Sequence, residues 1–190
     1  MTVTYLLHME QKDYKLEVIH FLLQERGHAR GIANKLGTNH MLVARKLSEL
    51  TKENVVDYVK EGKNKTYFLK KTTEALAYAF ISENYRIIQI IEKYPWLRSL
   101  VDKIQKNQKI DLALLFGSYA KGTASKDSDI DLYVETTDLT LRKELKLLDS
   151  RLSVIIGEYD KESALIKEIE KNHVALKGVE RFYQKNQFFK

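Results

Sequence analysis

Apolar residues recur every three or four positions through the first third of the chain, and glycine interrupts the recurrence twice. This period predicts amphipathic helices over residues 13–27, 29–36 and 39–50. Two runs rich in β-branched and aromatic residues follow at 55–60 and 65–69, and a glycine lies in the segment between them. The pattern therefore predicts three helices and then a β-hairpin.

The next helical stretch is longer and is apolar around much of its girth. Residues 72–94 carry large apolar side chains at spacings of three and four, and Pro95 ends the pattern. Residues 96–106 predict a further helix whose inward stripe begins with Trp96 and Leu97. Helices with so much apolar surface have to be buried against another element.

Short apolar runs alternate with helical patterns from residue 108 onward. Residues 112–116 predict a buried strand that stops at Gly117 and Ser118, where glycine allows the backbone to approach a ligand closely. A polar loop then leads to a second predicted strand at 129–134. A helix opening near residue 140 precedes a third strand at 152–156, another helix is predicted over 162–171, and residues 172–183 supply apolar side chains to cover the sheet.

The second of these strands carries the most informative polar side chains. Because successive side chains of a strand point to opposite faces, Asp129 and Asp131 should share one face while Ile130 and Leu132 enter the core. Two adjacent carboxylates repel, but they are stable with Mg²⁺ or Mn²⁺ between them, and these cations also bind substrate phosphates. The alternative is an acidic loop that runs into an edge strand.

The preceding turn suits the phosphates of such a ligand. Gly117 and Ser118 would offer backbone N–H groups and a hydroxyl to them. Lys121 and Lys126 in the loop either neutralise phosphate charge or are ordinary solvated lysines.

Composition narrows the classes of function. The chain has 190 residues, enough for one large or two small domains, and its hydrophobic fraction of 44% is that of a globular protein. The absence of cysteine excludes disulfides, thiolate metal sites and a cysteine nucleophile. No apolar run is long enough to span a bilayer and the N-terminus lacks a signal-peptide layout, so we expect a cytoplasmic protein without a membrane partner. A net charge of +6 permits a nucleic-acid or nucleotide partner.

The spacing Gly-Ser-x10-Asp-x-Asp, from Gly117 to Asp131 and flanked by two strands, resembles the nucleotidyltransferase motif of the DNA polymerase β superfamily. The closest likeness is to the minimal nucleotidyltransferase branch. The resemblance implies a short mixed sheet backed by helices, with the two aspartates holding the metals that activate a nucleoside triphosphate. Family members of this type are often paired with a small helical partner protein in toxin and antitoxin modules, so such a partner is a further expectation.

The same resemblance implies a third carboxylate on the next strand, and here the chain departs from the family pattern. The aligned position is Ser153, whose hydroxyl carries no charge and cannot act as a carboxylate base. Glu158 and Asp160 have the opposite strand parity, Asp149 lies before the strand, and Asp127 lies in the loop. The site therefore either uses a substitute carboxylate, binds a metal-nucleotide without turnover, or is a vestigial fold.

The order of elements over residues 13–70 resembles a winged helix-turn-helix, particularly in transcription regulators. The resemblance implies that the third helix lies in the major groove of double-stranded DNA and that the hairpin touches its backbone. The residues suited to these contacts are Asn39, His40, Arg45 and Lys46 on the helix and Lys63 and Lys65 on the hairpin. The alternative is a protein-interaction module, because several glutamates dilute the positive face.

In winged-helix regulators a helix like the one at 72–94 often packs against its copy in a second subunit, so a homodimer is expected. Packing between the two domains of one chain is the alternative.

We therefore predict an α+β protein with a winged helix-turn-helix domain (1–71), a helical linker or dimerisation segment (72–107) and a nucleotidyltransferase-like domain (108–190). The predicted function is binding of a Mg²⁺-nucleoside triphosphate, with transfer of a nucleoside monophosphate to an acceptor hydroxyl. Two alternatives are a transcriptional regulator whose impaired transferase domain senses nucleotide, and a transferase whose winged helix docks RNA or the acceptor.

Overall fold

The computed structural model describes residues 12–136 and 138–190, and the chain separates into two compact units, Met1–Ser82 and Glu83–Lys190. The division falls inside helix α5 (Thr73–Lys93). The predicted limits 1–71, 72–107 and 108–190 stay predictions, and residues 1–11 of the first segment lie outside the described residues.

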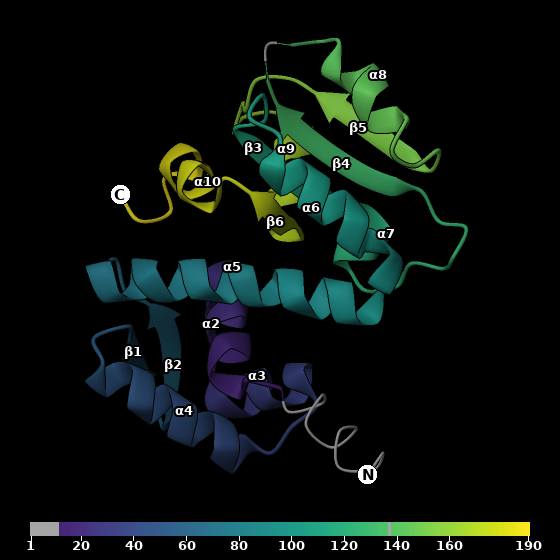
Figure 1. The fold of residues 1–190 in the computed structure, drawn as a ribbon. Helices are drawn as coiled ribbons and strands as arrows, with labels where there is room; N and C mark the ends of the chain where they lie inside the picture. The colour runs from purple at the N-terminus through teal and green to yellow at the C-terminus, as the bar shows by residue number, and fades with distance from the viewer. Residues whose placement is uncertain (1–11, 137) are drawn as a thin grey trace. The chain divides into compact units, whose positions relative to one another are not determined.

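The first unit has the elements that the hydrophobic period predicts, in the same order (Figure 1). They are α2 (Tyr14–Gln24), α3 (Ala29–Leu36), α4 (His40–Lys52), and the antiparallel strands β1 (Val56–Glu61) and β2 (Asn64–Leu69). Asp13 caps α2 by accepting hydrogen bonds from the amides of Lys15 and Leu16, and Asn39 caps α4 through the amide of Met41.

Helix α2 ends earlier than the predicted limit at Gly27. The backbone of Gly27 instead exchanges two hydrogen bonds with Tyr67 of β2, at 3.1 and 2.8 Å. A side chain at Gly27 would also approach the Phe21 ring to 2.8 Å, so the glycine belongs to this close strand contact rather than to the helix end.

The core of the first unit joins its three helices to the hairpin and to the start of α5. Val18, Ile19, Val43, Leu47 and Leu50 are buried on the helices. Helix α5 begins where the hydroxyl of Thr72 accepts the amide of Ala75. This half of the chain therefore buries a core of its own.

The second unit is built on a four-stranded sheet with the order β5-β4-β3-β6. Strands β4 and β5 are parallel and the other two pairs are antiparallel, which confirms the predicted short mixed sheet. After α5 the elements are η1 (Pro95–Leu97), α6 (Arg98–Lys106), β3 (Leu112–Phe116), α7 (Gly117–Ala120), β4 (Ile130–Glu135), α8 (Leu141–Lys146), β5 (Leu152–Ile156), α9 (Ala164–Lys171), β6 (Val174–Lys177) and α10 (Val179–Asn186).

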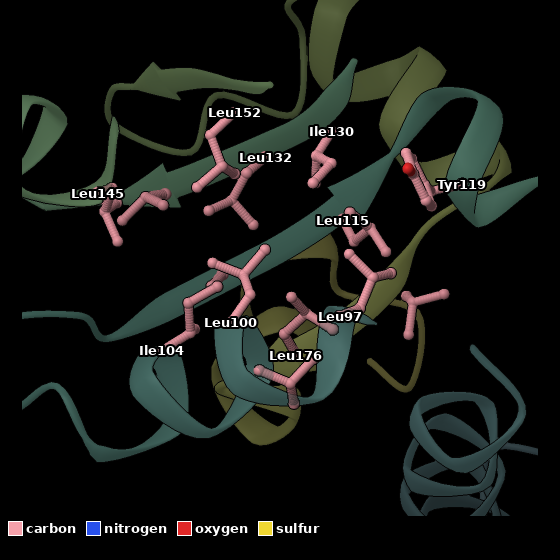
Figure 2. Close-up of a cluster of buried hydrophobic side chains, with 14 of the residues drawn as sticks. Leu97, Leu100, Ile104, Leu115, Tyr119, Ile130, Leu132, Leu145, Leu152 and Leu176 are labelled. Carbon is pink, nitrogen blue, oxygen red and sulfur yellow. The ribbon is translucent and has the colours of Figure 1, made fainter. Parts of the chain in front are cut away.

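Strand β4 is buried on both faces. Ile130, Leu132 and Val134 enter an apolar cluster with side chains from α6, α8 and β5 (Figure 2). On the opposite face the Tyr133 ring meets Tyr159 edge to face, with ring centroids 6.4 Å apart. The predicted alternation along β4 is confirmed, and it leaves the odd-numbered face for polar side chains at the strand's N-terminal end.

Two expectations about this unit were wrong. Residues 174–177 form a fourth strand rather than only covering the sheet. Trp96, expected in a buried stripe, has 44% of its surface exposed, because η1 is a tight three-residue turn that buries Leu97 instead. The indole N–H of Trp96 donates to the hydroxyl of Tyr119 in α7, at 3.4 Å.

Within the described residues, no helix is both long and apolar enough to cross a membrane.

Candidate functional site

The end of β3 and the start of β4 meet at one glycine. Gly117 follows β3 with a φ of +69°, which glycine adopts without strain. A Cβ at this position would lie 2.2 Å from Oδ2 of Asp131. The side chain of Asp131 therefore occupies the space against the Gly117–Ser118 turn.

Asp129 and Asp131 differ in their surroundings. Asp129 is exposed and immediately precedes β4, whereas Asp131 is half-buried within the strand, and the intervening Ile130 is fully buried. Burial raises the pKa of Asp131, and the charge of Asp129 raises it further. The two carboxylates therefore act on each other electrostatically.

The chemistry of this pair fits a divalent cation. Among the described residues, neither carboxylate accepts a hydrogen bond or pairs with a lysine, arginine or histidine. Two mutually repelling oxygen donors beside a glycine turn are suited to Mg²⁺ or Mn²⁺. The described residues contain no group of three or more His, Cys, Asp or Glu side chains arranged to hold a metal ion.

Ser153 is the lateral neighbour of Asp131. The two residues are direct partners in the parallel β4–β5 pairing, and the side chain of Ser153 is exposed. Paired residues of adjacent strands face the same side of a sheet. A hydroxyl thus stands beside Asp131 on the face where the family resemblance implies a carboxylate.

The substitutes for that carboxylate are engaged elsewhere or stand apart. Both oxygens of Asp149 bind the guanidinium of Arg151, at 3.0 and 2.7 Å, and this interaction lowers the pKa of Asp149. Asp160 accepts the amide of Glu162, while Glu158 and Asp127 are exposed. None of these carboxylates belongs to a three-residue cluster with Asp129 and Asp131 within the described residues.

Strand β4 carries another acidic residue, Glu135, which pairs with cationic side chains of α10. Glu135 is only 6% exposed and accepts hydrogen bonds from Arg181, at 2.8 Å, and from Lys185. Burial by itself would raise the pKa of Glu135, but these two cations outweigh it and lower the pKa. Arg181 and Lys185 are four residues apart on α10, a spacing that is visible in the sequence but belongs to none of the motifs named above.

The predicted DNA-contacting residues occupy two surfaces of the first unit. On α4, Asn39 is the helix cap and His40 is exposed, whereas Arg45 and Lys46 both pair with Glu49, at 3.9 and 2.9 Å. On the hairpin, Lys63 lies in the exposed turn and the ammonium of Lys65 lies over the Tyr58 ring, 4.0 Å from its centroid. Glu49 thus contacts two of the predicted DNA-contacting cations directly.

Comparison with known families gives one match. Residues 98–181 match the family model described as Polymerase beta, Nucleotidyltransferase. No curated protein matches the chain. The matched segment lies wholly within the second unit and contains Gly117, Ser118, Asp129, Asp131 and Ser153. The second unit therefore contains a nucleotidyltransferase-like domain.

Proposed function

We propose that the second unit binds a nucleoside triphosphate together with Mg²⁺ or Mn²⁺ and transfers a nucleoside monophosphate from it to an acceptor hydroxyl. The observation that carries this proposal is the contact between Asp131 and Gly117. It brings a pair of carboxylates, neither of which pairs with a cationic side chain among the described residues, against the Gly117–Ser118 turn. The family match over residues 98–181 supports the same class of chemistry.

Different residues of the site would contact the cation and the phosphates. Asp129 and Asp131 would hold the cation, and Gly117 and Ser118 would contact the phosphates. When bound, the cation would neutralise charge on the triphosphate. In the transfer, the acceptor oxygen bonds to the α-phosphorus, the bond from that phosphorus to the β-bridging oxygen breaks, and pyrophosphate leaves with the electron pair. The acceptor proton would pass to water, because the Ser153 hydroxyl is not a base at neutral pH.

A second candidate function is nucleotide sensing without turnover. It is favoured by one observation, the pairing of Asp131 with Ser153. Without a third carboxylate the site has no residue to hold a second cation or to accept the acceptor's proton. In that case the bound nucleotide would regulate the first unit, and added triphosphate would change DNA affinity without forming a covalent product.

Calorimetric titration tests binding. ATP, GTP, CTP and UTP would be titrated into the full chain with Mn²⁺ and then with Mg²⁺. We expect saturable heat with at least one nucleotide and its loss in Asp131→Asn. Asp127→Asn is the matched control, because Asp127 is an exposed loop aspartate of the same unit. An absence of heat with all four nucleotides would refute the proposal.

Label transfer separates the two candidates. The protein would be incubated with triphosphates labelled at the α-phosphate, alone, with tRNA and with cell lysate. Labelled product that disappears in Asp131→Asn supports transfer. Binding without any product in these three incubations supports sensing.

We also propose that the first unit binds double-stranded DNA through α4 and the hairpin. Support comes from the order of elements and from the cations on both surfaces. Filter binding of duplex DNA over a salt series tests it, with a linear fall of log affinity against log salt expected. Higher affinity for RNA than for duplex DNA would instead favour an acceptor-docking role.

A homodimer through α5 remains part of this proposal. Ile81 and Ile88 are about half exposed and lie seven residues apart, hence on one side of the helix. Light scattering of the wild type and of Ile88→Glu tests it, since a charge in an apolar interface should leave only monomer.

A further inference from the structure

Cationic side chains from elsewhere in the second unit donate to three backbone carbonyls, one at the end of α7 and two in the loop that joins α7 to β4. Arg86 donates to the carbonyl of Ala120 at 3.0 Å. Lys93 donates to Gly122 at 2.6 Å, and Arg151 donates to Lys126 at 2.6 Å. All three acceptors lie between the Gly117–Ser118 turn and Asp129.

Two of the three cations come from a single helix. Arg86 and Lys93 are seven residues apart on α5, which is about two helical turns, so they project from the same side. Their acceptors, Ala120 and Gly122, are only two residues apart. Gly122 has a φ of +69°, and a Cβ there would lie 3.2 Å from the ammonium of Lys93. A glycine at this position thus leaves room for the lysine.

The side chain of the third cation, Arg151, is oriented by Asp149. Arg151 is bound through Nε and Nη2 to both oxygens of Asp149, and its own amide also donates to that carboxylate at 3.0 Å. With Nε and Nη2 bound in this way, the remaining nitrogen, Nη1, points to the carbonyl of Lys126 and donates a hydrogen bond to it. The backbone carbonyl of Arg151 accepts the amide of Ile130, at 2.9 Å, so the same residue also contacts the first residue of β4.

In these contacts three cationic side chains are bound to backbone carbonyls. Residues 123–129 contain no helix or strand, and this segment leads from the turn to Asp129, which immediately precedes β4. Hydrogen bonds from charged donors to carbonyls are among the stronger ones in proteins. An irregular loop that is held at two points along its length, and at the end of the helix before it, has fewer conformations available to it.

We propose that Arg86, Lys93 and Arg151 are positioning residues, which hold the end of α7 and the loop over residues 121–126 so that Asp129 keeps the position beside Asp131 and the Gly117–Ser118 turn that a metal-bound triphosphate requires. They act through the backbone and do not touch the ligand. The identity of the ligand rests on the proposed function. The inference that these three residues hold the loop does not depend on the proposed function.

Hydrogen exchange of the full chain without nucleotide tests the loop directly. The variants are Lys93→Met and Arg151→Gln, with Lys103→Met, an exposed lysine of α6, as the control. We expect amide exchange over residues 117–129 to become about tenfold faster in both variants, the effect of losing one charge-assisted hydrogen bond. The unfolding midpoint should stay within about 2 °C of the wild type. Unchanged exchange over this segment in both variants would overturn the inference.

Calorimetric titration with Mn²⁺ and a nucleoside triphosphate supplies the second readout. Dissociation constants should rise about tenfold in Lys93→Met and Arg151→Gln, whereas Lys103→Met should bind as the wild type does. Weaker binding with unchanged exchange in the free protein would mean that the cations contact phosphate directly, which also overturns a positioning role. If the wild type binds no nucleotide, the proposed function fails, yet the exchange experiment still decides whether these cations hold the loop.

Discussion

Asp131 takes the space that any side chain at position 117 would need, since a Cβ on Gly117 would lie 2.2 Å from its Oδ2 atom. Gly117 directly follows β3 whereas Asp131 lies in β4, and the cross-strand partner of Asp131 is Phe116, the residue just before the glycine. The phosphate turn and the carboxylate are therefore packed as one unit, and the choice of glycine at 117 follows from steric fit as well as from its positive φ.

Gly117→Ala should cost more in ligand binding than in stability. The left-handed backbone penalises alanine by about 1–2 kcal/mol, and the new methyl group would also displace the Asp131 carboxylate. We expect nucleotide affinity to fall about tenfold or more, measured by calorimetric titration with Mn²⁺.

Gly37→Ala provides the matched control. Gly37 has a φ of +62°, but a Cβ added there would have no atom within 4 Å. The left-handed backbone should lower the free energy of unfolding of this variant by the same amount, about 1–2 kcal/mol, and nucleotide binding should be unchanged. Equal losses of affinity in both variants would show that the contact with Asp131 does not matter.

Ser153→Asp should add the missing carboxylate beside Asp131. The substitution places a third negative charge on the same sheet face, so divalent cations should bind more tightly and the free protein should be slightly less stable. Mn²⁺ binding followed by electron paramagnetic resonance measures the number of ions per chain, and label transfer measures turnover. Ser150→Asp, at an exposed site before β5, is the control. The same ion stoichiometry and turnover in both variants would contradict this assignment of Ser153.

Glu135→Gln should destabilise the second unit in a pH-dependent way. Because the pKa of Glu135 is lowered in the folded protein, its contribution is present above the unfolded pKa of about 4.3 and is lost as the pH falls through the folded value. We expect a loss of about 1–3 kcal/mol at pH 7, reduced from the range for fully buried pairs because Arg181 is partly exposed. Urea unfolding at pH 7 and pH 3 measures the loss, and an equal loss at both values would refute the ion-pair explanation.

Tyr183→Phe should destabilise the interior of the second unit through Glu83. The Tyr183 hydroxyl donates to Oε1 of this buried glutamate at 3.1 Å, and its Oε2 atom has no partner among the described residues. Losing the donor should cost about 1–3 kcal/mol in the free energy of unfolding. In a double-mutant cycle with Glu83→Gln, the two losses should not be additive; additive losses would mean that the hydrogen bond contributes nothing.

Glu49→Gln should strengthen DNA binding by the first unit. Glu49 contacts both Arg45 and Lys46, and Lys46 as the nearest donor lowers the pKa of this carboxylate. Removing its charge leaves both cations to phosphate, so filter binding should show higher affinity and a salt dependence steeper by about one to two phosphate contacts. Glu168→Gln, which removes a similar surface pair on α9, is the control, and an identical response in both variants would contradict this role for α4.

Local patterns predicted the elements that depend on neighbours in the sequence. The alternation of Asp129, Ile130, Asp131 and Leu132 predicted which of these side chains enter the core at the start of β4. Ser153 was aligned with a family position on residue spacing, and it proves to be the partner of Asp131 in the parallel pairing. The strand period was enough to assign the faces of β4, whereas the position of Ser153 came from the family resemblance.

Features that depend on distant partners were missed. Strand β6 has only four residues, and its pairing with β3, some sixty positions earlier in the chain, has no local signature. The sequence also offered Asp149 as a substitute ligand, since nothing in a linear pattern showed that Arg151, two residues away, would bind both of its oxygens. The contacts between cationic side chains and loop carbonyls could not be predicted for the same reason. Every residue has a backbone carbonyl, so the sequence does not show which of them accepts a hydrogen bond.

Trp96 is the single tryptophan of the chain, and its indole reaches the hydroxyl of Tyr119, two residues beyond Gly117. Trp96 is therefore an intrinsic fluorescence probe for this turn. Ligands that shift the turn would alter the emission of one identifiable fluorophore, without any label having to be attached.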